Sequence, residues 1–143
     1  MGNKYDNQNY KHSDLTKRII SEFYYVYNSL GHGFLEKVYE KALFSRLKAV
    51  GLFVQKQYPI NVYFENELVG EYFADLIIDE TVIVEIKAVE AIHPMHEVQL
   101  VNYLKATEIE VGLLVNFGET LEIKRKVFSN KRNTQRKIDA EER

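Results

Sequence analysis

Hydrophobic side chains recur every three or four positions along the first part of the chain, which is the spacing of one helix face. The first run predicts a helix over residues 14–29, with an inner face made by Leu15, Ile19, Phe23, Val26 and Leu30. Gly31 and Gly33 then interrupt the pattern, because glycine suits a helix end and allows a sharp change of direction. The second run predicts a helix over residues 34–50, with an inner face made by Leu35, Val38, Tyr39, Ala42, Leu43 and Leu47.

After this helix the hydrophobic positions alternate with polar ones, which is typical of strands. The alternation predicts extended segments over residues 53–57 and 58–64, where Pro59 marks a local break or an edge position. Two further strands are predicted over residues 68–78 and 81–87, joined by a tight turn.

Helical spacing returns next and predicts a helix over residues 94–106, with Pro94 in its first turn. Its predicted inner face is made by Met95, Val98, Val101 and Leu104. Two more strands are predicted over residues 110–117 and 121–127. The order is therefore α-α-β-β-β-α-β-β, in which three strands form an antiparallel meander and the next helix is a crossover. We expect an α/β fold with a mixed sheet of about four to six strands flanked by helices.

The chain of 143 residues has the length of one domain, and 45% hydrophobic residues suffice for a core. We expect a flexible N-terminal arm over residues 1–12, a single domain over residues 13–128 and a basic, flexible tail over residues 129–143. No apolar run is long enough to span a bilayer, and the N-terminus lacks the apolar stretch of a signal peptide. We therefore expect no membrane contact. Cysteine is absent, which excludes disulfides and thiolate ligands and fits a cytoplasmic protein.

The net charge of −2 is unusual for a protein that binds nucleic acid, but the charge is unevenly distributed. Residues 124–143 carry eight Lys or Arg against three acidic residues, a net +5, so the rest of the chain carries −7. A basic segment on an acidic domain suits contact with a phosphate backbone. The alternative is a solvated tail that keeps the protein soluble.

Three charged residues, Asp75, Glu85 and Lys87, stand beside the apolar runs of the two strands on either side of the tight turn. Side chains alternate across a strand, so Glu85 and Lys87 share one face. The tight turn brings Asp75, ten positions before Glu85, back beside it. Buried charges are costly unless they pair or bind a metal. The cluster is therefore either an ion pair of Glu85 with Lys87 or a site where carboxylates hold a divalent cation.

The second explanation matches the requirements of phosphodiester hydrolysis. A metal polarises the phosphate and lowers the pKa of the attacking water, and a nearby cation stabilises the developing negative charge. Asp75 and Glu85 suit the metal, with the backbone carbonyl of Ile86 as a further oxygen ligand, and Lys87 suits the negative charge. Because such oxygens favour hard ions, we expect Mg²⁺ or Mn²⁺.

These residues resemble the PD-(D/E)XK nuclease superfamily, with Asp75 on one strand and Glu85, Ile86 and Lys87 on the next. A helix and a strand follow, which is the order of the α-β-β-β-α-β core of that superfamily. Ala74 is a departure, since a proline usually precedes the aspartate. The resemblance implies a restriction-endonuclease-like core.

The flanking helices carry two more matches. Gln99 and Tyr103 match the Gln-x-x-x-Tyr element of the RecB-like and lambda-exonuclease-like branch, where it helps to orient substrate and active site. Glu36 lies in the first turn of a predicted helix, where the helix dipole favours a carboxylate. The resemblance implies that Glu36 is instead the first-helix glutamate that supports the metal site.

A closer resemblance is to the small prokaryotic GxxExxY proteins, whose signature is present as Gly33, Glu36 and Tyr39. Residues 85–90 and 96–100 are also similar, so the likeness covers nearly the whole predicted domain. Within the signature, we expect Tyr39 to be a core aromatic residue with its hydroxyl hydrogen-bonded.

His93 and His96 stand near the start of the helix over residues 94–106. Imidazole can bind a metal or donate to a phosphate, but a lone histidine near a helix start is more often structural or exposed. We therefore assign neither of them to catalysis.

Two functions follow from the sequence. The first is a metal-dependent nuclease, with DNA as the expected partner, whose site residues are Glu36, Asp75, Glu85, Lys87, Gln99 and Tyr103. In it Asp75, Glu85 and the carbonyl of Ile86 hold Mg²⁺ or Mn²⁺, with Glu36 as an optional ligand. The second is a catalytically inactive nuclease-fold module that binds nucleic acid or a protein partner. The aromatic residues of the first helix, Tyr24, Tyr25 and Tyr27, also allow a homodimer.

Overall fold

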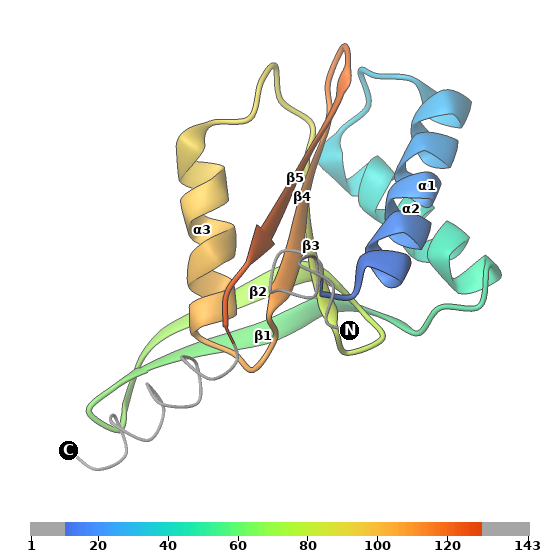
Figure 1. The fold of residues 1–143 in the computed structure, drawn as a ribbon. Coiled ribbons are helices and arrows are strands. Elements are labelled where there is room, and N and C mark those ends of the chain that lie inside the picture. The colour runs from blue at the N-terminus through green and yellow to red at the C-terminus, as the bar shows by residue number, and fades with distance from the viewer. Residues whose placement is uncertain (1–10, 130–143) are drawn as a thin grey trace, which may run out of the picture.

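The structure is a computed structural model that describes residues 11–129 (Figure 1). The predicted arm over residues 1–12 and tail over residues 129–143 lie almost wholly outside this range. The described chain contains helices α1 (Ser13–Leu30), α2 (Glu36–Ala49) and α3 (Pro94–Lys105), and strands β1 (Val54–Phe64), β2 (Glu67–Ile78), β3 (Val82–Lys87), β4 (Val111–Phe117) and β5 (Leu121–Val127). This is the order that the sequence predicts. No helix in the described range has the length and hydropathy needed to cross a bilayer.

The five strands form one mixed sheet in the order β1-β2-β3-β4-β5. β3 and β4 run parallel, whereas each other neighbouring pair is antiparallel. A parallel pair needs a crossover connection, and α3 supplies it between these two strands. α1 and α2 cover one face of the sheet and α3 covers the other (Figure 1). The predicted α/β fold with a mixed, helix-flanked sheet is confirmed.

Each face of the sheet has its own hydrophobic core. Phe23 and Tyr39 are fully buried on the face under α1 and α2, and Ile83 is fully buried on the face under α3. β4 is buried at every position, and β3 at every position except its last. Because helices cover both faces, these two strands are almost continuously apolar. A charged residue there, such as Glu85, needs a separate explanation.

The inner face of α3 differs in part from the predicted one. Leu104 is fully buried, as predicted. Met95 and Val98, which the helical spacing predicts to face the sheet, are 61% and 47% exposed, and the fully buried Leu100 takes their place. Leu100 approaches the sheet closely because Gly112 lies opposite it. A Cβ on Gly112 would stand 2.6 Å from Leu100 Cδ1. Gly112 therefore leaves the room that Leu100 occupies against the sheet.

The start of α2 also differs from the prediction. The helix begins at Glu36 rather than at Phe34, and Leu35 is the extended residue just before it. Leu35 is 79% exposed and Val38 is 38% exposed, so neither contributes to the inner face. Gly33 has a φ of 107°, a conformation that only glycine adopts readily, and this permits the sharp turn into the helix.

β1 and β2 form a long hairpin that extends away from the rest of the sheet (Figure 1). Only residues 76–78 of β2 pair with β3. β1 is an edge strand, as Pro59 indicated, but Pro59 pairs regularly with Phe73 and does not break the strand. The backbone departs from the extended conformation at Gln57 instead, whose φ is 51°, and the pairing with β2 shifts register between Val62 and Tyr63.

Candidate active site

β2 and β3 separate at the candidate site, where two carboxylates accept hydrogen bonds from the backbone. The pairing of the strands ends at Leu76 and Val84, so Asp75 and Glu85 would form the next pair. Instead, the backbone N–H of Asp75 donates to Glu85 Oε2 at 2.7 Å. The backbone N–H of Ile86 donates to Asp75 Oδ2 at 2.8 Å. Backbone groups of the opposite strand therefore hold each carboxylate beside the other.

Both carboxyl groups are costly to ionise at this position. Glu85 is 7% exposed, and burial, followed by the negative charge of Asp75, raises its pKa to about 8. Burial also raises the pKa of Asp75, although the hydrogen bond from the N–H of Ile86 opposes this rise. A cation beside the pair would favour the ionised form of both groups. The pair is therefore a place where a positive ion is stabilised.

Lys87 and Glu36 lie close enough to this pair to affect its ionisation. Burial raises the pKa values of Glu36, Asp75 and Glu85, and the ammonium group of Lys87 lowers all three. Glu36 is exposed at the first position of α2, and the charge of Asp75 also raises its pKa. The start of α2 and the end of β3 therefore meet at one site.

Gln99 and Tyr103 approach the site from α3. Gln99 Nε2 donates to the hydroxyl of Tyr103 at 2.6 Å. Tyr103 is 5% exposed, and burial, followed by the charge of Glu85, raises its pKa. The structure thus places all six predicted site residues around the point where β2 and β3 separate: Glu36, Asp75, Glu85, Lys87, Gln99 and Tyr103.

The fold and this geometry agree with a comparison against known families. A family model described as "PD-(D/E)XK nuclease superfamily" matches residues 13–127. The chain belongs to the PD-(D/E)XK nuclease superfamily. It is also similar to a solved structure titled "Crystal structure of SSO0001", with 16% sequence identity and a TM-score of 0.50, covering 91% of this chain and 67% of that one. At this identity the likeness supports the fold alone. No curated protein matches the chain.

PD-(D/E)XK nucleases generally use divalent metals, and the donor atoms of this chain fit one. Within residues 11–129, hydrogen bonds to the two carboxylates involve only Asp75 Oδ2 and Glu85 Oε2, so each group keeps a second oxygen. The backbone carbonyl of Ile86 is the third oxygen that the sequence predicts as a ligand. Mg²⁺ is commonly held by one or two carboxylates together with waters. The same described range contains no cluster of three or more His, Cys, Asp or Glu side chains arranged for a metal, so Glu36 does not complete such a cluster.

His93 and His96 cap the start of α3. The N–H of Met95 donates to His93 Nδ1 at 3.0 Å, and the N–H of His93 donates to His96 Nδ1 at 3.1 Å. This reciprocal arrangement satisfies two amides at the helix start. Burial, followed by the charge of Lys87, lowers the pKa of His96, which favours the neutral form that accepts the hydrogen bond. Both histidines thus have the structural role that the sequence favours.

Tyr39 lies in the core, where it stabilises the turn before α2. Its hydroxyl donates to the carbonyl of Gly31 at 2.7 Å and accepts from the N–H of Phe34 at 3.3 Å. Its ring stacks on Phe117 with 4.3 Å between the ring centroids. The predicted core aromatic with a bonded hydroxyl is confirmed.

Sequence reasoning missed a second acidic residue on α2. Glu40 is 6% exposed, its Oε2 lies 3.0 Å from Lys37 Nζ, and its Oε1 accepts from Gln57 Nε2 at 2.7 Å. Burial is the larger influence on the pKa of Asp75, and the charge of Glu40 raises that pKa further. The available signal was the spacing of four residues from Glu36, which puts both acids on one helix face.

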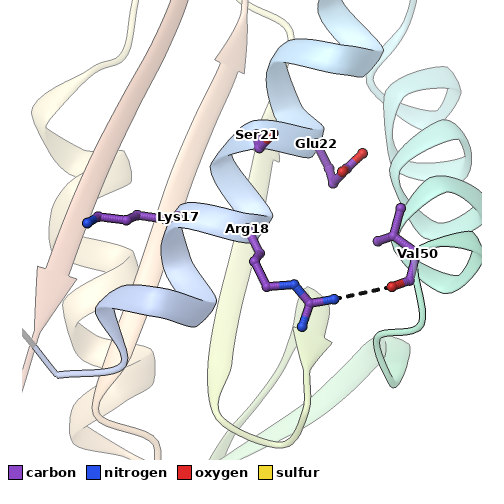
Figure 2. A pocket seen from close by; sticks show the side chains of 5 residues that line it. All are labelled: Lys17, Arg18, Ser21, Glu22 and Val50. Carbon is purple, nitrogen blue, oxygen red and sulfur yellow. Dashed lines mark hydrogen bonds between the residues drawn. The ribbon is translucent and has the colours of Figure 1, made fainter.

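A separate cavity of about 300 Å³ lies between α1 and the residue that follows α2 (Figure 2). It is lined by Lys17, Arg18, Ser21, Glu22 and Val50. Arg18 Nη2 donates to the carbonyl of Val50 at 3.2 Å, and Lys17 points away from Arg18. Val50 follows the last residue of α2 and Glu36 begins that helix, so roughly 20 Å of helix separates the cavity from Glu36. The cavity is separate from the candidate site.

Proposed function

We propose that the protein is a metal-dependent nuclease that hydrolyses phosphodiester bonds in DNA. The observation that carries the proposal is the pair of buried carboxyl groups, Asp75 and Glu85, which backbone hydrogen bonds hold side by side near Lys87. The alternative, a simple ion pair of Glu85 with Lys87, does not account for Asp75, the second carboxylate at this position. Membership of the superfamily supports the reaction class, and the choice of DNA rests on the resemblance in sequence.

In this proposal Asp75, Glu85 and the carbonyl of Ile86 hold Mg²⁺ or Mn²⁺. Glu36, which completes no ligand cluster with them in the described residues, assists through its negative charge from α2. A bound divalent ion supplies Lewis-acid chemistry for the phosphate and the attacking water. Lys87 places a positive charge beside the negative charge that develops on the phosphate. Its half-buried position at the end of β3 supports this role, since a charge acts more strongly away from bulk water.

Gln99 and Tyr103 position the site from α3. The hydrogen bond from Gln99 fixes the hydroxyl of Tyr103, and the raised pKa of Tyr103, caused first by burial, keeps that hydroxyl protonated. A protonated hydroxyl can donate a hydrogen bond to a phosphate or to a carboxylate. Tyr103 is therefore assigned to orient the substrate rather than to accept a proton.

The proposal also contains finer assignments. We assign the chain to the GxxExxY group through Gly33, Glu36 and Tyr39, and we place the protein in the cytoplasm. The basic segment over residues 124–143 supports contact with the DNA backbone. Its larger part lies outside the described residues.

A homodimer through α1 is a further assignment. Tyr24 and Tyr25 are 48% and 52% exposed, and aromatic residues are enriched in protein interfaces. Tyr27 does not share this surface, because its hydroxyl donates to the carbonyl of Gly118 at 2.8 Å. Light scattering measures the mass of the particle, and a mass of one chain at all concentrations contradicts the dimer.

A catalytically inactive module that binds nucleic acid or a protein partner is the second candidate. Two observations favour it: Ala74 replaces the usual proline, and the net charge is −2. This candidate predicts binding without turnover. It also predicts that Asp75→Asn leaves every measurable function unchanged.

Cleavage of supercoiled plasmid with Mg²⁺ or Mn²⁺ tests the proposal. The wild-type protein is expected to nick the plasmid, Asp75→Asn to abolish nicking, and Lys87→Ala to slow it by about 100-fold or more. Glu119→Gln, at an exposed turn between β4 and β5, is the matched control and should cleave normally. Cleavage that survives in both site variants contradicts the assignment of the site. DNA binding without cleavage by the wild type supports the inactive module.

A further inference from the structure

The contact between Glu40 and Gln57 has no part in the chemistry proposed above. Glu40 is a buried carboxylate on α2, and Gln57 is an exposed residue on the edge strand β1. Gln57 Nε2 donates to Glu40 Oε1 at 2.7 Å, and Lys37 Nζ lies 3.0 Å from the other carboxylate oxygen. A buried carboxylate needs such partners. The contact joins the helix that carries Glu36 to the hairpin that carries Asp75.

Gln57 has an unusual backbone conformation at a position directly opposite Asp75. The pairing of β1 with β2 is formed on both sides of these two residues and keeps its register, but the two residues themselves are left out of it. The φ of Gln57 is 51°, in the left-handed region that side chains other than glycine rarely adopt. Such a conformation persists where the surroundings hold it in place. The hydrogen bond to Glu40 is a direct means of holding it.

The interruption coincides with a change of face along β2. Ala74 and Ile77 are both buried in the core under α3, although residues three apart on a regular strand face opposite sides. Asp75 lies inside this change. Its carboxylate accepts the N–H of Ile86 on the neighbouring strand, so it points along the sheet towards β3. Regular pairing through Asp75 would instead place its side chain over one face of the sheet.

We propose that Glu40 and Gln57 are positioning residues for Asp75. The carboxylate of Glu40 holds Gln57 in the left-handed conformation, which interrupts the pairing of β1 with β2 opposite Asp75. The interruption lets the carboxylate of Asp75 turn towards β3 and Glu85. Neither residue contacts the substrate or the metal in this arrangement. The importance of Asp75 rests on the proposed function, but the effect of the pair on its orientation does not.

Exchange of the two partners tests the inference in the full-length protein. Gln57→Glu opposes two carboxylates and breaks the contact. The double variant Glu40→Gln/Gln57→Glu restores one carboxylate and one amide with their places exchanged. Lys37→Ala is the matched control, because it removes the other partner of Glu40 and leaves Gln57 in place. If Gln57→Glu does not fold, Gln57→Ala takes its place with the same expectation.

Two measurements separate this inference from the proposed function. Amide hydrogen exchange of Ile86, followed by NMR without metal, reports the hydrogen bond that Asp75 Oδ2 accepts. Calorimetric titration with Mn²⁺ reports the metal site. We expect Gln57→Glu to speed exchange at Ile86 and to weaken Mn²⁺ binding, each by about ten-fold or more. The exchanged pair should restore both values, and Lys37→Ala should change neither by more than about two-fold.

The outcomes are distinguishable. Unchanged exchange at Ile86 in Gln57→Glu, or a loss that the exchanged pair does not restore, overturns the positioning role even if the wild type binds Mn²⁺. A wild type that binds no Mn²⁺ contradicts the proposed function, whereas restored exchange in the double variant still supports the positioning role. Rescue by exchange identifies a specific contact, because a general loss of stability would not be repaired by a second substitution.

Discussion

The backbone N–H of Asp75 and the carboxylate Oε2 of Glu85 lie 2.7 Å apart, at the point where the pairing of β2 with β3 would otherwise continue. A side chain thus takes the place of a backbone acceptor within the sheet. If Glu85 left this position, the backbone N–H of Asp75 would stay buried without an acceptor, which is costly. The shape of Glu85 and its charge can therefore be tested separately. Glu85→Gln keeps the shape and an acceptor oxygen for this hydrogen bond, and it removes the charge.

The charge of Glu85 is expected to destabilise the fold in the absence of metal. Its pKa is raised from 4.5 to about 8, first by burial and then by the charge of Asp75. The contribution of protonated Glu85 to the free energy of unfolding is therefore fully present below pH 4.5 and is lost as the pH rises through 8. Glu85→Gln should therefore unfold at the same urea concentration as the wild type at low pH. Near pH 8 the variant should be more stable, on the order of a few kcal/mol.

Urea unfolding with a chelator present, at several pH values, checks this prediction. Glu119→Gln, at an exposed position, is the control and should follow the wild type throughout. A stability difference between Glu85→Gln and the wild type that stays constant with pH would show that the charge of Glu85 is not the cause.

The same raised pKa predicts that metal binding releases a proton. Below pH 8 Glu85 is mainly protonated, because burial and then the charge of Asp75 disfavour its ionised form, and a metal ligand must be deprotonated. Near pH 7 we expect close to one proton released per Mn²⁺ bound, falling towards zero well above pH 8. Titration calorimetry in two buffers with different ionisation enthalpies measures this number. A binding enthalpy that does not depend on the buffer near pH 7 would contradict the prediction.

The hydroxyl of Tyr103 is expected to serve cleavage more than folding or metal binding. Tyr103→Phe removes the acceptor of the Gln99 hydrogen bond, which should cost about 1 kcal/mol of stability. The proposed positioning role predicts that cleavage falls by roughly 10- to 100-fold, since one oriented donor is lost. Mn²⁺ affinity should stay unchanged, because the hydroxyl is not assigned as a ligand. Tyr63→Phe, at a residue 55% exposed on the hairpin, is the control. Full cleavage by Tyr103→Phe would remove this residue from the site.

The order of helices and strands and the pair of Asp75 and Glu85 could be predicted because both appear as patterns along the sequence. Helical and alternating patterns mark the elements, and Asp75, Glu85 and Lys87 are marked as charges that stand directly beside apolar runs. The turn at Asp79 and Glu80 then places the two carboxylates together. Both turn residues adopt left-handed φ values of 51° and 53°, as a tight hairpin turn requires.

The details that were missed depend on contacts between distant segments. Gly112 leaves the room that Leu100 of α3 occupies, but it lies on a distant strand and so adds nothing to the helical pattern of α3. The left-handed conformation of Gln57 follows from a contact with Glu40 on α2, whereas Pro59 gave a stronger local signal for a break. Glu40 is buried although it is charged, and the hydrogen bond that it accepts comes from Gln57 on the distant hairpin, so its sequence neighbours do not reveal it.

The contact of α3 with β4 gives a prediction for the fold alone. Gly112→Ala places a Cβ 2.6 Å from Leu100 Cδ1, so the Leu100 side chain or α3 itself must shift. We expect a loss of about 1–3 kcal/mol in the free energy of unfolding, the usual cost of overpacking. Leu100→Ala should also destabilise the protein, by about 2–5 kcal/mol. In the double variant the losses should be smaller than their sum, because the smaller side chain makes room for the methyl group. Strict additivity of the two losses would contradict the contact.

The position of a bound metal tests the central claim most directly. Crystals soaked in Mn²⁺ allow the ion to be located by its anomalous scattering. The account predicts a peak at roughly 2 Å from carboxylate oxygens of Asp75 and Glu85 and from the carbonyl oxygen of Ile86, and no such peak in Asp75→Asn crystals. A peak elsewhere, or no peak at Mn²⁺ concentrations that support cleavage, would contradict it.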